Sequence, residues 1–254
     1  LRVVAAVAAG GSPAAPLAPG EAVRIFTGAP VPPGADAVVM QERTDAADGR
    51  VRVLDAVKPG KNVLPRGAEM RRGEVVLPAG TAFTPAAAGL LAAVGRSTAR
   101  LTPPPRVAVL ATGNELVEPD AAPGPGQIRN SNGPMLVAQV ARAGGFPHYL
   151  GIARDDPADL RHLLDKGLTE WHVLLVAGGA SVGDFDLVPS TLAALGVTAH
   201  FHKVRMKPGK PLLFGTRGDA LVFGLPGNPV SAFVCFELFV RPALRALGGH
   251  RDPG

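Results

Sequence analysis

The sequence predicts an α/β protein whose larger part is a mostly parallel, doubly wound sheet, preceded by a smaller β-rich domain. After the three prolines at 103–105, short apolar runs alternate with helical patterns, which is typical of a parallel sheet with helices on both faces. One run, 173–177, is apolar throughout, as in a strand buried on both sides. Residues 1–72 instead contain short β-prone runs between Pro-Gly and Asp-Gly turns.

The composition is that of a folded globular chain, with 46% apolar and 19% charged residues. A formal charge of +5 favours anionic ligands in general. Trp and Tyr occur once each, so the interleaving of basic and aromatic residues that would suggest a nucleic-acid partner is missing. The single Cys235 excludes an internal disulfide and a cysteine zinc cluster, and we expect it to be a buried, inert thiol.

Neither membrane insertion nor secretion is expected. The longest apolar stretch, 230–240, is too short to cross a bilayer and contains Glu237. No signal peptide is visible, although the chain begins without Met, so an upstream segment can precede it. A reduced, cytoplasmic setting fits best.

Three segments are predicted: a β-rich, barrel-like domain (1–72), a linking segment (73–103) and an α/β domain (104–250). Strands are expected in the first two segments at 23–26, 37–40, 51–57 and 74–77. A helix follows over 85–94, with Thr84 as its cap, Pro85 as its first residue and Gly95 as its stop.

The α/β domain alternates strands and helices. Strands are predicted at 107–111, 148–153, 173–177, 199–206, 212–215 and 220–223. Helices are predicted from Asn132 to the stop at 144–145, from the cap at 154–157 to Leu168, over 187–195 and over 230–247. The last helix is capped by Asn228, begun by Pro229, kinked near Pro242 and ended by Gly248.

Three strands of this domain end in loops of similar composition: 112–115, 178–184 and 226–229. In a parallel sheet these loops share one edge, where ligands bind, and their glycines let backbone N–H groups approach a ligand. One such loop alone could serve close packing, but three predict a ligand site. The candidate binding residues are Thr112, Gly113, Gly178, Gly179, Ser181, Gly183, Pro226, Gly227, Asn228 and Pro229.

A basic loop follows the fourth predicted strand. Lys203, Arg205, Lys207 and Lys210 lie within eight residues, with a Pro-Gly turn between the last two lysines. Lysine point charges in this arrangement suit a phosphate or another oxyanion. The alternative is a solvated basic edge, which is the usual fate of a charge run.

Four carboxylates belong to the same edge: Glu115, Asp155, Asp184 and Asp186. Carboxylates beside phosphate-binding groups indicate Mg²⁺, which takes one or two acids and keeps waters or phosphate oxygens. For Asp155, capping of the next helix is an equal alternative. The histidines show no zinc-ligand spacing, and Ser181 lacks the G-x-S-x-G context of acyl transfer.

Five stretches, in order, resemble the molybdopterin molybdenumtransferase family (MoeA type), to which the gephyrin E domain is related. They are RIFTGAPVPPGADAVVMQE (24–42), ATGNEL (111–116), GGASVGD (178–184), KPGKP (207–211) and GLPGNPVS (224–231). The resemblance covers essentially the whole chain. The first stretch is the most specific, because the wider molybdopterin-binding group shares only the later loops.

The resemblance implies an enzyme of molybdenum cofactor biosynthesis. It implies that molybdopterin-AMP and molybdate are the substrates and that Mg²⁺ assists release of AMP. Homodimers are implied, with each site between the α/β domain of one subunit and the β domain of the other. The molybdopterin adenylyltransferase that makes the substrate is a candidate partner.

Residue roles follow from the matched positions. The implied catalytic residues are Glu115, Asp155, Asp184 (where Glu is more usual), Asp186 and Lys203. The implied metal ligands are Asp184 and Asp186. Lys207 and Lys210 would bind molybdate or phosphate, Pro226 and Pro229 would shape the pocket, and Thr27 and Glu69 (where Asp is expected) would face the site from the β domain.

The chain departs from the family pattern at both ends. An amino-terminal Ser-Ala-Met-Asp-Gly-Tyr-like motif and a carboxyl-terminal β domain are absent, so we expect binding with poor or no turnover. Two alternatives stay open. A molybdopterin adenylyltransferase shares the α/β loops, but residues 1–72 argue against it, and a gephyrin-like dimeric scaffold would need a peptide-docking signature that the sequence does not show.

Overall fold

The computed structural model describes residues 1–13, 15–179 and 187–251. The chain divides into two compact units, Leu1–Val76 and Leu77–Gly254, and each is considered by itself. The division falls four residues beyond the expected end of the β-rich domain at 72. The helix of the expected linking segment, α1 (Pro85–Ala93), lies in the second unit, and Thr84 caps it as predicted by accepting a hydrogen bond from Ala87 N at 3.2 Å.

The first unit is β-rich, as predicted. Its sheet has the order β2-β1-β4-β3. The strands are β1 (Arg2–Val7), β2 (Glu21–Ile25), β3 (Thr44–Ala47) and β4 (Arg50–Val53). The β1 and β2 strands pair in parallel, whereas β4 is antiparallel to both of its neighbours. Because β2 and β3 stand at the two ends of this order, the sheet is open within the described residues.

Two strand predictions in this unit are wrong. Residues 37–40 form no ladder, because Val38 N donates to Lys61 O (2.9 Å) and Val38 O accepts from Asn62 Nδ2 (2.8 Å). Residues 74–77 do not form a strand either, since Glu74 closes a turn with Arg71 through its backbone N–H and its carboxylate. The local partners of these backbone groups take the place of a neighbouring strand.

The second unit contains a six-stranded sheet in the order β10-β11-β12-β9-β5-β8. The strands β8, β5, β9 and β12 pair in parallel, and β11 is antiparallel to both of its neighbours, β12 and β10. The mostly parallel prediction is therefore confirmed. The bounds are β5 (Arg106–Thr112), β8 (Phe146–Ala153), β9 (Val173–Ala177), β10 (Thr198–Phe201), β11 (Leu213–Arg217) and β12 (Ala220–Leu225).

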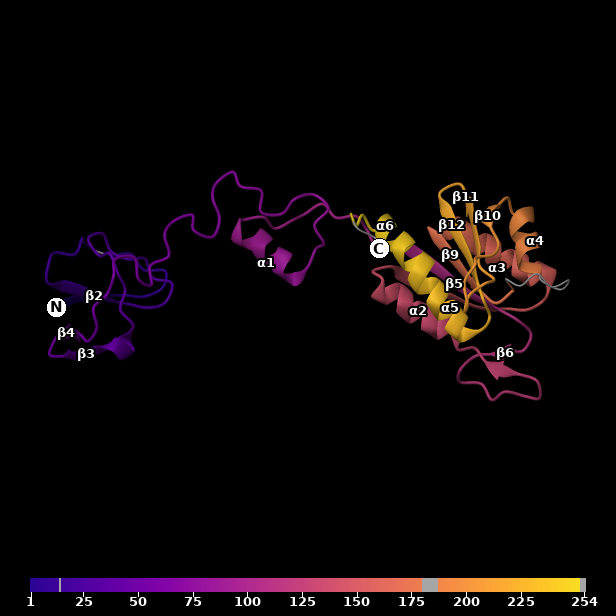
Figure 1. Cartoon of the computed structure of the whole chain (residues 1–254), viewed down its shortest axis with the longest axis horizontal. Helices are drawn as coiled ribbons and strands as arrows, with labels where there is room; N and C mark the ends of the chain where they lie inside the picture. Colours follow the sequence, from indigo (N-terminus) through magenta and orange to yellow (C-terminus); the bar gives the residue numbers. More distant parts are fainter. Residues whose placement is uncertain (14, 180–186, 252–254) are drawn as a thin grey trace. The chain divides into compact units, whose positions relative to one another are not determined.

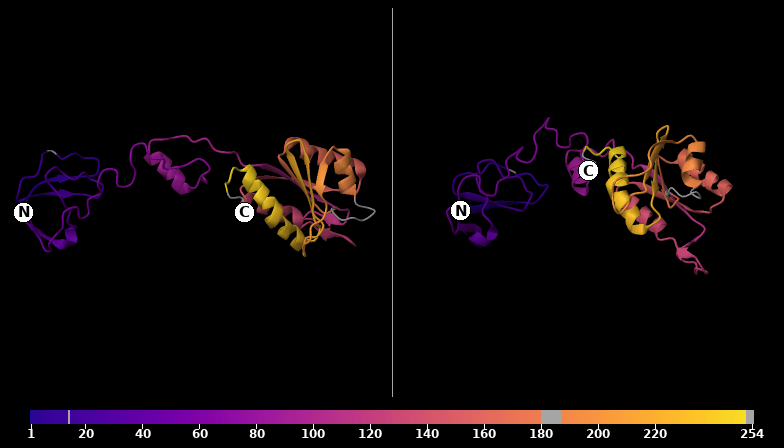
Figure 2. Two further views of the ribbon diagram at one scale, coloured as in Figure 1. Left: turned by 45° about the horizontal axis from the view of Figure 1, so that its top comes forward. Right: turned by 45° about the vertical axis from the view of Figure 1, so that its right-hand side comes forward.

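Helices cover both faces of this sheet (Figures 1 and 2), which confirms the doubly wound arrangement. One face holds α2 (Asn132–Arg142), α5 (Pro229–Cys235) and α6 (Arg241–Leu247), and the other holds α3 (Pro157–Glu170) and α4 (Leu187–Ala194). Alternate residues of β5 enter the two cores: Val107 and Val109 pack on the first side, and Ala108 and Leu110 on the second.

The last helix differs in detail from the single kinked helix that the sequence predicts. A π-helical turn, η2 (Phe236–Val240), joins α5 to α6 directly before Pro242, and Arg241 N–H bonds to Phe236 O. Because proline has no N–H to donate, a wider turn beside it is a common solution. Cys235 is completely buried here, as predicted.

A small parallel pair, β6 (Leu116–Val117) with β7 (Ile128–Arg129), follows β5 and was not predicted. Two-residue strands are too short to give a periodic pattern. In the part of the chain that the structure describes, no helix is long and apolar enough to cross a membrane.

Candidate functional site

A pocket of about 380 Å³ lies at the carboxyl ends of the central strands. Ala177 pairs with Ala111 of β5 and with Leu225 of β12, so the residues that follow leave the sheet at one level. The lining residues are Thr112, Gly113, Glu115, Leu116, Ile128, Asn132, Asp155, Leu160, Ala177, Gly178, Gly179, Leu187, Val188, Pro211, Pro226 and Gly227. Residues of all three predicted loops line this one pocket, which confirms that the loops converge.

Two buried polar side chains of the pocket keep an atom without a hydrogen-bond partner among the described residues. They are Thr112, 7% exposed, through Oγ1, and Asn132, 8% exposed, through Oδ1. The other amide atom of Asn132, Nδ2, donates to Gly227 O at 2.8 Å and so joins the start of α2 to the loop after β12. Buried polar atoms are normally paired, so these two indicate groups that a ligand can satisfy.

Gly178 and Gly179 keep the space beside Thr112 open. Their φ angles are +93° and +62°, a region that residues with a Cβ rarely occupy. A Cβ on either glycine would lie 3.0 Å from Thr112 Oγ1, and one on Gly178 would also lie 2.7 Å from Thr112 O. The glycines are therefore required by both backbone conformation and space.

Two of the predicted acids, Glu115 and Asp155, line the pocket. Asp155 is held by Asn114: Asn114 N donates to Asp155 Oδ2 (3.3 Å), and Asp155 N donates to Asn114 Oδ1 (3.1 Å). The capping alternative for Asp155 is wrong, because Asp156 caps α3 by accepting from Ala158 N and Asp159 N. Asp155 therefore remains available at the pocket.

The donor set of the pocket fits a magnesium ion. Glu115 and Asp155 supply two carboxylates, and Mg²⁺ takes one or two from a protein while keeping waters or substrate oxygens. No group of three or more metal-binding side chains occurs within 1–13, 15–179 and 187–251, so the described residues form no closed metal cage. The predicted residues Ser181, Gly183, Asp184 and Asp186 lie outside the described residues.

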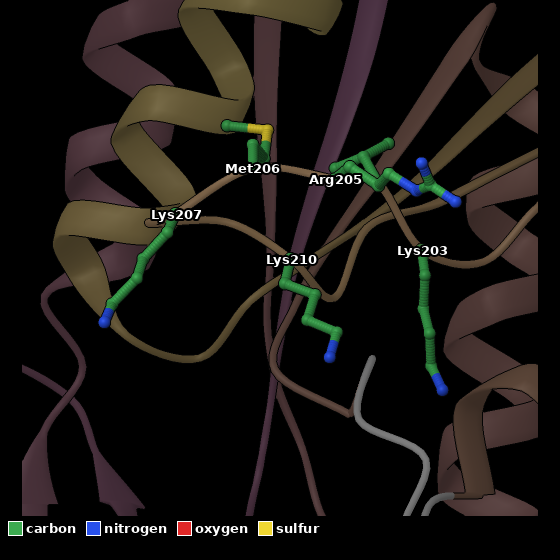
Figure 3. A pocket seen from close by; sticks show the side chains of 6 residues that line it. Lys203, Arg205, Met206, Lys207 and Lys210 are labelled. Carbon is green, nitrogen blue, oxygen red and sulfur yellow. The ribbon is translucent and has the colours of Figure 1, made fainter.

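The basic loop lines a second, open hollow of about 590 Å³ (Figure 3), made by Lys203, Val204, Arg205, Met206, Lys207 and Lys210. The predicted strand 199–206 ends at Phe201, because Val204 N turns to Lys210 O (3.0 Å). The three lysine side chains leave the loop on one side and Met206 on the opposite side. With the described residues these lysines form no ion pair, so their charges are free for an anion.

The two hollows adjoin along one stretch of chain. Lys210 lines the basic hollow and the next residue, Pro211, lines the pocket. The lysines themselves are not among the residues that line the pocket. A ligand that places a neutral part in the pocket and an anionic part beside Pro211 would meet both surfaces.

Several predicted binding residues lie elsewhere. Asn228 caps α5 by accepting from Ser231 N at 3.2 Å, and Pro229 is the first residue of that helix; neither lines the pocket. Thr27, in the turn after β2, and Glu69 are exposed in the first unit. Their predicted roles stay predictions.

Asn132 is the polar lining residue that sequence reasoning missed. The sequence predicts the start of a helix at Asn132, which is correct, but the capping position is Ser131, and Asn132 is a buried residue that lines the pocket. One side chain is enough to cap a helix, so the two asparagines of Asn130-Ser131-Asn132 indicate that one of them has another role. The apolar lining residues Leu116, Ile128, Leu160, Leu187, Val188 and Pro211 were also missed.

Comparison with known families identifies the family of this fold. Residues 108–246, more than half of the chain, match the model described as a probable molybdopterin binding domain. The chain belongs to this family. Residues 2–95 match the model of the MoeA N-terminal region (domains I and II), so both units of this molybdopterin-binding family member have a counterpart.

Curated relatives of known name support the same family assignment. The chain is 42% identical over 252 residues to the molybdopterin molybdenumtransferase of Nostoc sp. (98% of this chain, 58% of that protein). It is 38% identical over 248 residues to that of Bacillus subtilis (96% and 58%). The predicted resemblance is thus confirmed, and the chain spans about three fifths of the length of these relatives.

A solved structure of a molybdopterin biosynthesis moeA protein from Pyrococcus horikoshii is similar over the whole chain. Its TM-score is 0.77 at 35% identity, covering 100% of this chain and 63% of that one. A molybdenum cofactor biosynthesis protein from Pyrococcus furiosus matches with a TM-score of 0.54 at 28% identity, over 73% of this chain and 56% of that one.

Proposed function

We propose that this chain is the substrate-binding and catalytic part of a molybdopterin molybdenumtransferase, which inserts molybdate into adenylylated molybdopterin and releases AMP. One observation carries the proposal: a pocket with unpartnered polar atoms and two carboxylates adjoins a basic hollow along the segment Lys210–Pro211. The relatives from Nostoc sp., Bacillus subtilis and Mycobacterium tuberculosis are named molybdopterin molybdenumtransferases, which supports the same reaction.

The lysines supply charge for the anionic part of the reaction. Lys203, Lys207 and Lys210 would hold the phosphates of the substrate or the incoming molybdate as point charges. The bond that breaks is the P–O bond between the two phosphates: an oxygen of water or molybdate forms the new bond to the pterin phosphorus, and the electron pair leaves with AMP, where negative charge accumulates. Positive groups that already stand in place stabilise such charge without reorganising.

The carboxylates supply a metal site and positioning. One or two of the acids Glu115, Asp155, Asp184 and Asp186 would hold Mg²⁺, and the family resemblance implies Asp184 and Asp186 as the ligands. When bound, Mg²⁺ offsets the negative charge of the phosphate oxygens. The two hydrogen bonds that Asp155 exchanges with Asn114 position its carboxylate.

A homodimer completes the proposal. Thr27 and Glu69, in the β domain of one subunit, would face the site in the α/β domain of the other subunit. The enzyme would be cytoplasmic and would receive its substrate from the molybdopterin adenylyltransferase. These statements rest on the family resemblance.

The test incubates the purified chain with adenylylated molybdopterin, Mg²⁺ and molybdate. AMP release with molybdenum retained on the pterin supports the proposal. Absence of AMP release rejects the proposed reaction, whether or not the substrate binds. Consumption of ATP and free molybdopterin would instead identify an adenylyltransferase, and a scaffold would show none of these activities.

A matched pair of variants ties the reaction to the acidic edge. Asp186→Asn is expected to abolish Mg²⁺-dependent release of AMP and to leave pterin binding unchanged. Asp120→Asn, an exposed acid that lies outside both hollows, serves as the control and should keep the wild-type rate. Equal rates for the two variants would remove Asp186 from the reaction.

A further inference from the structure

We infer that Asn132, together with Thr112, recognises the amino group of the heterocycle that the substrate places in the pocket. This inference rests on the proposed function, because it names the chemical feature by which the same site selects its substrate. It adds a specificity-determining residue that stands on an element, α2, separate from the three predicted loops.

Burial without a partner is the first argument. Asn132 and Thr112 both line the pocket and are more than nine-tenths buried, and Asn132 Oδ1 and Thr112 Oγ1 each lack a hydrogen-bond partner among the described residues. An unpaired buried acceptor destabilises the folded state, so such an atom indicates a position where a bound ligand donates the missing hydrogen bond.

The orientation of the amide is the second argument. Asn132 Nδ2 donates to Gly227 O at 2.8 Å. Exchanging the amide oxygen and nitrogen would place two carbonyl oxygens against each other, so the contact with Gly227 assigns the nitrogen to that side. Oδ1 is therefore the atom left for the ligand, and as an acceptor it selects an N–H or O–H donor.

The pocket walls indicate what carries the donor. Leu116, Leu160 and Val188 provide apolar surface, and Gly178 and Gly179 leave room beside the Thr112 hydroxyl. A volume of about 380 Å³ lies at the lower end of the range of ligand pockets. Apolar walls with a few fixed polar atoms suit a flat heterocycle, and both the pterin and the adenine of the proposed substrate carry an amino group.

Gln139 offers a matched control on the same helix. It is also buried, 4% exposed, and its Oε1 also lacks a partner among the described residues, but it does not line the pocket. Its Nε2 donates to Glu237 Oε1 at 2.9 Å. Gln139→Ala should therefore affect stability without changing which ligand is preferred.

The experiment measures four dissociation constants by isothermal titration calorimetry on the chain. AMP is compared with purine riboside 5′-monophosphate, and pterin with 4-hydroxypteridine; each second compound lacks the amino group. We expect the wild type to prefer the amino compound of one pair about 5- to 50-fold, the loss associated with one unpaired buried acceptor. The pair that shows this preference identifies the ring that the pocket holds.

The variants assign the preference to its residues. The ratio of interest is the dissociation constant of the compound without the amino group divided by that of the amino compound. Asn132→Ala should bring this ratio close to one, whereas Gln139→Ala should keep the wild-type ratio. If Asn132→Ala folds poorly, Thr112→Val is the substitute, because it keeps the side-chain shape and removes the hydroxyl. It should lower the ratio, and Thr112→Ser should restore it.

Two outcomes overturn the inference: no preference in the wild type for either pair, or a preference that survives both Asn132→Ala and Thr112→Val. Failure of the proposed function looks different. If the chain releases no AMP from adenylylated molybdopterin but its amino preference still depends on Asn132, the recognition stands and the assigned reaction falls.

Discussion

Asn114 and Asp155 exchange two hydrogen bonds, each residue donating its backbone N–H to the side chain of the other. The pair joins the loop after β5 to the loop after β8, two neighbouring parallel strands. Arg154, beside Asp155, adds a bond from its guanidinium to Leu116 O at 3.2 Å. The acid at the pocket is therefore positioned by the two loops before any ligand arrives.

The geometry of this pair and the charge of Asp155 can be separated by mutation. Asp155→Asn keeps an oxygen that accepts from Asn114 N, so the free energy of unfolding in urea should stay within about 0.5 kcal/mol of the wild type. Mg²⁺-dependent release of AMP should fall strongly. Asn114→Ala removes the bond from Asp155 N to Asn114 Oδ1 and keeps the backbone donor of residue 114, so it should cost about 1 kcal/mol in the same urea measurement. If Asp155→Asn reacts at the wild-type rate, the charge has no part in the reaction.

Lys207→Ala should weaken molybdate binding. Lys207 is exposed at an open hollow, so a salt-dependent loss of about 3- to 5-fold at low ionic strength is expected in equilibrium dialysis. Lys166→Ala, an exposed lysine of α3 that does not line the hollow, is the control. An affinity that is the same for both variants would show that Lys207 does not hold the oxyanion.

Gly178→Ala should destabilise the fold more than Gly144→Ala. Both glycines have positive φ (+93° and +84°), so either substitution should lower the free energy of unfolding by about 1–2 kcal/mol through backbone strain alone. A Cβ at Gly144 meets nothing within 4 Å, whereas one at Gly178 would lie 2.7 Å from Thr112 O. Crowding should add about 1–3 kcal/mol for Gly178→Ala in urea unfolding. Equal losses would mean that the pocket wall moves aside without cost.

The main architecture was predictable because the α/β unit follows simple periodic rules. The run 173–177 became β9 with the predicted bounds, and the alternation of strands and helices specified a parallel sheet with two covered faces. The convergence of the loops after β5, β9 and β12 followed from the same rule, since parallel strands end at one edge.

The failures arise where tertiary partners override local preference. Val38 lies in an apolar run, yet its N–H and C=O bond to Lys61 and Asn62, a choice that no local pattern reveals. Strand β1 contains Ala5 and Ala6, which weaken the β signal although β2 pairs with it. The role of Asn132 depends on Gly227, 95 residues away, so its sequence neighbours could not disclose it.

Cys235 should make the stability of the protein fall at high pH. Burial raises the pKa of its thiol to about 11, above the value of about 8.5 for a free cysteine. Above pH 8.5 the unfolded chain therefore binds fewer protons than the native state, and the free energy of unfolding decreases as pH rises toward 11. Its contribution is at most about 3–4 kcal/mol, and it is fully present below pH 8.

The measurement compares urea unfolding of the wild type and Cys235→Ala between pH 8 and 10.5. The variant is less stable at every pH because it leaves a cavity, so the slopes are compared and not the absolute values. We expect a smaller decrease with pH for Cys235→Ala. Burial and the Glu118 carboxylate also raise the pKa of the Tyr149 hydroxyl, which steepens the decrease in both proteins alike, so the contribution of Tyr149 cancels when the two slopes are compared. Parallel curves would show that the native thiol ionises as easily as the unfolded one.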